Sequence, residues 1–114
     1  MKINPQIKKN KEVSIIYGND NSINISIFNN EVLMEIVGSF DSNLKELEKM
    51  SRSKIYFRGN SIIIKGEKHT NKKVKDAIEY LINRFKVEKK IDKSDVIASL
   101  NQDMTIRTPK LIRA

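Results

Sequence analysis

Apolar residues recur along the chain at two spacings, and each spacing predicts a different kind of element. In residues 23–28, isoleucines alternate with mostly polar neighbours, which is typical of a strand with one buried face. The same alternation occurs in 55–58 and again in 61–65. Gly59 and Asn60 separate these two ranges, so they predict a β-hairpin. Residues 13–17 predict one further short strand.

Helical spacing is clearest between positions 70 and 85. Six apolar residues fall on one side of a helix there, with the spacing that lets a helix cover a sheet: Val74, Ala77, Ile78, Leu81, Ile82 and Phe85. Thr70 or Asn71 is the expected first residue of this helix. A short helix is also expected from Asp92 or Ser94 to about residue 100.

Two short helices are expected in succession before the hairpin. Asn29 or Asn30 can cap the first, and Gly38 can end it. Asp41 or Ser42 can cap the second, which extends to about residue 50.

The resulting order, β-α-α-β-β-α, is that of a KH-like α+β domain. We expect a sheet of three strands, or of four if 13–17 joins it, covered on one face by helices. Residues 1–12 are polar and lysine-rich and predict a disordered basic arm. The domain is expected to span 13–88, followed at 89–114 by the short helix and a basic linker or tail.

The net charge of the chain is a weaker argument for nucleic-acid binding. The chain of 114 residues has a formal net charge of +8, which is typical of nucleic-acid binding. Residues 1–12 carry +3, 13–85 only +2, and 86–114 another +3, so most of the excess lies outside the expected domain. A lysine-rich composition can also come from A/T-rich codons alone.

Composition argues against catalysis and against a membrane location. The chain has no cysteine and one histidine, His69, so we expect neither a metal site nor a catalytic triad. None of its four glycines begins a G-x-x-x-x-G-K-[ST] loop, so no ATP site is expected. With no apolar run long enough for a membrane span or signal peptide, a cytoplasmic protein is expected.

The turn Gly38-Ser39-Phe40-Asp41 is the candidate binding site. In KH domains a G-x-x-G turn between two helices contacts the backbone of single-stranded RNA. Here an aspartate replaces the second glycine and adds negative charge, which Lys45 can offset. Arg58 is expected to flank the same groove. The competing interpretation is an ordinary corner between two helices, with Asp41 as a cap.

The same stretch resembles a known family. Residues 37–48 read V-G-S-F-D-S-N-L-K-E-L-E, and 58–66 read R-G-N-S-I-I-I-K-G. Both resemble the N-terminal region of bacterial PhoH-like proteins, which show G-x-x-D-x-N-L-K-x-[LI]-E followed by R-G-N. The resemblance covers about residues 22–87. Residues 106–110, I-R-T-P-K, are similar to the basic segment that leads to the family's ATPase domain.

The resemblance implies a KH-like module of a cytoplasmic P-loop ATPase family tied to RNA metabolism. ATP and Mg²⁺ belong only to the family's ATPase domain, which this chain is expected to have lost. The expected function is weak, poorly sequence-specific binding of single-stranded RNA. The expected RNA-binding residues are Gly38, Ser39, Phe40, Asp41, Asn43, Lys45 and Arg58.

Two other hypotheses stay open. The chain can be a protein-interaction module that associates with itself or with a PhoH-like ATPase, through a hairpin face that includes Tyr56 and Lys65. It can also be a gene fragment without a present role.

Overall fold

The computed structural model describes residues 12–101, in which four antiparallel strands form one sheet. They are β1 (Val13–Tyr17), β2 (Ile23–Ile27), β3 (Lys54–Arg58) and β4 (Ser61–Lys65), in the spatial order β1-β2-β4-β3. The predicted hairpin is β3–β4, in which Ile55 pairs with Ile64. The strand expected at 13–17 pairs with β2, so the sheet has four strands.

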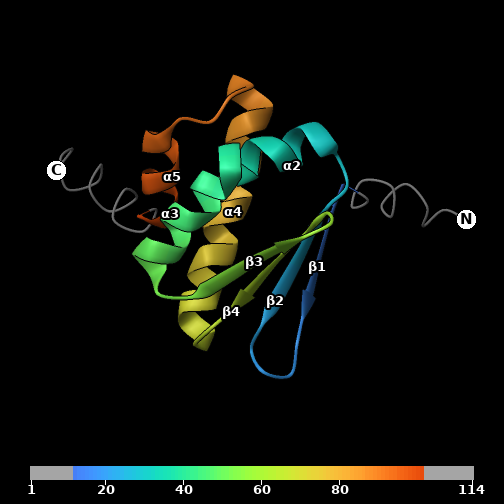
Figure 1. Cartoon of the computed structure of the whole chain (residues 1–114), viewed down its shortest axis with the longest axis vertical. Coiled ribbons are helices and arrows are strands. Elements are labelled where there is room, and N and C mark those ends of the chain that lie inside the picture. Colours follow the sequence, from blue (N-terminus) through green and yellow to red (C-terminus); the bar gives the residue numbers. More distant parts are fainter. Residues whose placement is uncertain (1–11, 102–114) are drawn as a thin grey trace, which may run out of the picture.

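Helices cover one face of this sheet (Figure 1). They are α2 (Asn30–Val37), the 3₁₀ turn η2 (Ser39–Asp41), α3 (Ser42–Ser51), α4 (Lys68–Glu88) and α5 (Lys93–Leu100). From β2 onward the order is β-α-α-β-β-α, with β4 between β2 and β3. The α+β fold class and the KH-like element order predicted from the sequence are therefore confirmed.

The apolar residues of the strands and of the helices form one hydrophobic core. The inward residues of β2 and β4 alternate as predicted, and Ile25, Ile62 and Ile64 are completely buried. All six apolar residues of the α4 stripe are buried against them. Helix α5 adds Val96 to the same core, so the packed unit extends beyond position 88.

The start of α4 differs from the prediction. The helix begins at Lys68 rather than at Thr70 or Asn71, and Glu67 precedes it without a side-chain cap. Asn71 lies inside the helix and is fully buried. Its amide is unavailable for capping because it bonds to segments outside the helix.

Those bonds join three parts of the chain. Asn71 Nδ2 donates to the carbonyl of Asn21 at 2.8 Å and to the carbonyl of Gly66 at 3.1 Å. Asn71 Oδ1 accepts a hydrogen bond from Ser53 Oγ at 2.8 Å. One side chain thus connects the β1–β2 turn, the segment before β3 and the segment between β4 and α4.

The basic arm and the tail expected at the two ends lie almost wholly outside the described residues. Within residues 12–101, no helix combines the length and the apolar character that crossing a bilayer requires.

We predict that Asn71→Ala lowers the free energy of unfolding by about 2–4 kcal/mol, because a fully buried side chain loses its bonds to two partly buried carbonyls and to the hydroxyl of Ser53. Urea unfolding followed by circular dichroism measures this. Asn83→Ala, an exposed change on the same helix, should stay within about 0.5 kcal/mol of the parent. Equal stability of the two variants would show that the buried amide does not hold the fold together.

Candidate nucleic-acid interface

The turn between α2 and α3 has an unusual backbone. Gly38 ends α2 with φ 83° and donates its N–H to the carbonyl of Met34. The N–H of Asp41 then closes the turn on the carbonyl of Gly38 at 3.1 Å. Phe40 (φ 52°) and Asp41 (φ 62°) are both left-handed, which costs a residue with a side chain roughly 1–2 kcal/mol. Strain of this kind is concentrated at binding and catalytic sites.

Phe40 stands at the tip of this turn. Its relative exposure is 93%, the highest among the exposed large apolar residues in the described part of the chain. Burial therefore gives no reason for an aromatic ring there, and the backbone conformation disfavours it. A flat apolar ring held in solvent can stack on a nucleobase.

Asp41 does not act as the predicted cap of α3. It precedes the helix, but its side chain makes no capping hydrogen bond. The physical reason is the left-handed backbone, since capping side chains normally reach the helix amides from an extended conformation. Ser42, the alternative cap, is already helical, with φ −60°. The start of α3 therefore has no capping bond from either residue predicted to supply one.

Asn43 holds the turn in place. Its Nδ2 donates to the carbonyl of Glu35 at 3.1 Å, which links α3 back to α2. The same amide lies over Gly38, where an added Cβ would approach Asn43 Cγ to 2.8 Å. The structure therefore gives Asn43, predicted to bind RNA, a positioning contact within the protein.

Glu35 connects this corner to the C-terminal part of the domain. Its Oε2 accepts the backbone N–H of Ile91 at 3.1 Å, in the segment between α4 and α5. Asp95 then ties α5 to α4 through a 3.2 Å contact with Arg84 Nε. These bonds fix α5 alongside α3, next to the turn (Figure 1).

A basic groove of about 450 Å³ lies between the start of α3 and α5. It is lined by Ser42, Asn43, Lys45, Glu46, Lys49 and Lys93. All three lysines are exposed, and none forms an ion pair within residues 12–101. Three cations facing one acidic residue favour an anionic ligand.

The structure separates Arg58 from this groove. Arg58 ends β3, and the hairpin turn beside it bonds to the end of β2, where Asn60 O accepts the N–H of Ile27 at 2.9 Å. That contact lies near the start of α2, whereas Gly38 lies at its end, about 12 Å away along a helix of 8 residues. Gly38, Ser39, Phe40, Asp41, Asn43 and Lys45 come together, and Arg58 is not among the lining residues.

Two lysines of the groove were not predicted as site residues. Lys49 follows Lys45 by four positions, so helical spacing alone places both on one face. Lys93 carries no comparable signal, because its position depends on how α5 packs against α3. No cluster of three or more potential metal ligands occurs in residues 12–101.

Comparison with known proteins adds no assignment. A scan against protein-family models and searches of curated proteins and of solved structures found no match to this chain.

We predict that Gly38→Ala destabilises the protein more than Gly59→Ala. Both glycines have positive φ, so both changes carry a conformational penalty of roughly 1 kcal/mol. Only at Gly38 would the new methyl group meet Asn43 and Ser42, at 2.8–2.9 Å, while Gly59 has no atom within 4 Å. Thermal unfolding of the two variants measures the difference. Equal losses would mean that Asn43 moves aside without cost.

Proposed function

We propose that this chain is a KH-like module that binds single-stranded RNA, corresponding to the N-terminal region of a PhoH-like P-loop ATPase. The observation that carries the proposal is the groove with three unpaired lysines beside a strained, exposed turn. The resemblance of residues 37–48 and 58–66 to the PhoH-like pattern supports the family assignment. The chain itself has no Walker A loop, so ATP binding is not part of the proposal.

In this proposal the sugar–phosphate backbone lies along the groove. Lys45 and Lys49 contact phosphates from α3, and Lys93 contacts them from α5. The first amides of α3 add the positive end of the helix dipole. Asp41 does not compete for these amides, because its carboxylate makes no capping bond.

Phe40 supplies the base contact. Its ring is the one aromatic group in the turn, and base stacking on such a ring is tolerant of sequence. We therefore expect RNA binding with little sequence preference. Because the contacts are mainly electrostatic and Asp41 and Glu46 lie close to the lysines, we expect weak and salt-sensitive binding.

We predict that Lys45→Gln, Lys49→Gln and Lys93→Gln together weaken binding of a single-stranded oligouridylate at least about tenfold at low salt. Each phosphate contact with a single strand contributes about −0.7 to the slope of log K against log salt, so losing three should flatten the slope by about 2. Fluorescence anisotropy over a range of salt concentrations measures both quantities.

The matched control is Lys54→Gln, Lys65→Gln and Lys68→Gln, which removes the same charge from exposed positions outside the groove. It should retain most of the affinity. If both triple variants lose affinity equally, binding reflects overall charge and not the groove. If neither loses affinity, the proposed site is wrong.

A further inference from the structure

The two edges of the sheet differ in a way that matters for association. Strand β1 forms one edge, and within residues 12–101 it pairs with β2 alone. Its sequence, V-S-I-I-Y, contains no charge and no proline. Natural edge strands normally carry such features, because a free row of backbone N–H and C=O groups recruits another strand. The opposite edge strand, β3, does carry charged residues, namely Lys54 and Arg58.

Side chains on β1 are also poorly covered. Ile16 points to the helix-free face of the sheet with 61% exposure, and Tyr17 lies at the end of the strand with 64% exposure. Val13 and Ile15 face the helices, but they are only half-buried, unlike the inward residues of β2. The helix-facing side chains of β1 are therefore less well covered than those of β2.

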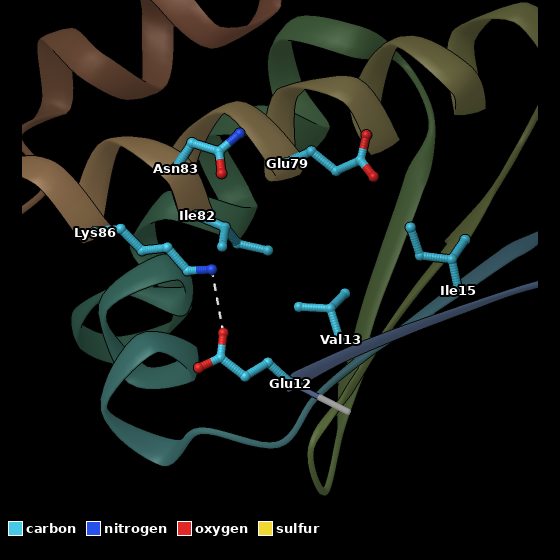
Figure 2. A pocket seen from close by; sticks show the side chains of 7 residues that line it. All are labelled: Glu12, Val13, Ile15, Glu79, Ile82, Asn83 and Lys86. Atoms are coloured by element: carbon cyan, nitrogen blue, oxygen red, sulfur yellow. Dashed lines mark ion pairs between the residues drawn. The ribbon is translucent and has the colours of Figure 1, made fainter. Parts of the chain in front are cut away.

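A groove of about 470 Å³ lies beneath the same edge (Figure 2). Val13 and Ile15 form its strand side, and Glu79, Ile82 and Asn83 of α4 form its helix side. Glu12 and Lys86 bridge the two sides through an ion pair of 3.1 Å. A fifth strand added next to β1 would direct its inward side chains into this space, because side chains alternate between the two faces of a sheet.

We infer that the occupant of this edge is β1 of a second copy of the chain, paired antiparallel about a two-fold axis through Ile15. That register sets Val13 opposite Tyr17 and Ser14 opposite Ile16, twice each. Residues that face inward stay inward, so Val13, Ile15 and Tyr17 of one copy cover the groove of the other. The result is a continuous sheet of eight strands with a self-complementary interface.

The distribution of charge favours self-pairing through β1 over self-pairing through β3. Two copies of a chain with net charge +8 repel each other, so the contact must not bring further cations together. Pairing through β1 brings no charged residue of the strand opposite another. The equivalent pairing of β3 about Tyr56 would set Lys54 opposite Arg58 twice, which is unfavourable.

The contact is small, which sets its expected strength. Stable protein–protein interfaces bury at least about 1,200 Å² of accessible surface in total, and two paired strands of five residues bury less than that. We therefore expect a weak dimer that dissociates on dilution. The interface does not depend on RNA, and it is separate from the groove between α3 and α5.

The test is sedimentation equilibrium of the full chain without RNA over a wide range of concentrations. The parent protein should show a reversible monomer–dimer equilibrium. Ser14→Lys with Ile16→Lys should remove the dimer, because the inferred register sets lysine opposite lysine twice on the solvent face. Ser14→Glu with Ile16→Lys should restore it, because each lysine then faces a glutamate.

Tyr56→Lys is the control, since it adds a lysine at an exposed position of β3, the edge of the sheet away from β1. It should leave the dimer unchanged. Circular dichroism checks that each variant is folded. A parent protein that is monomeric at every concentration overturns the inference. So does a folded Ser14→Lys, Ile16→Lys variant that still forms a dimer, and so does the absence of rescue by glutamate.

Discussion

The fold depends on one buried amide. Asn71 sits inside the first turns of α4 and bonds to the β1–β2 turn, to the segment before β3 and to the segment after β4. Hydrophobic burial alone would allow α4 to slide or rotate over a sheet of similar isoleucines, whereas three directional bonds to three loops allow a single placement. Helices α2, α3 and α5 pack against α4, so its placement bears on theirs.

The corner itself is held by a second set of polar contacts. Asn43 links α3 to the carbonyl of Glu35, and the Glu35 carboxylate links α2 to the segment before α5. Because the turn is anchored on both sides, it can keep two residues with side chains in left-handed conformations and a phenylalanine in solvent. The same contacts bring Lys93 to the groove. Structural polar bonds thus position the charged side chains that we propose bind RNA.

Much of the fold was predictable because it follows from periodicity. Alternating isoleucines predicted β2 and β4, and the apolar stripe of α4 predicted the face that is buried. Contacts between distant segments were not predictable. Asn71 was expected near the first residue of its helix, but it lies inside α4, where its side chain bonds to residues 21, 53 and 66. Asp41 was expected to cap α3 because an aspartate before a helix normally does so. The left-handed backbone that prevents capping arises in the turn and is not visible in the sequence. For the candidate site, Gly38 to Lys45 could be grouped without a structure because they are neighbours in sequence. The place of Lys93 and the separation of Arg58 from the groove depend on packing.

We propose that single-stranded RNA contacts the α2–α3 corner. An NMR titration of the full chain with a single-stranded oligouridylate, following the backbone amides, tests this most directly. We expect the largest shift changes in residues 38–45 and at Lys49 and Lys93, and we expect them to shrink as salt is added. Shift changes confined to the strands, or an absence of changes in the corner at saturating RNA, would contradict it.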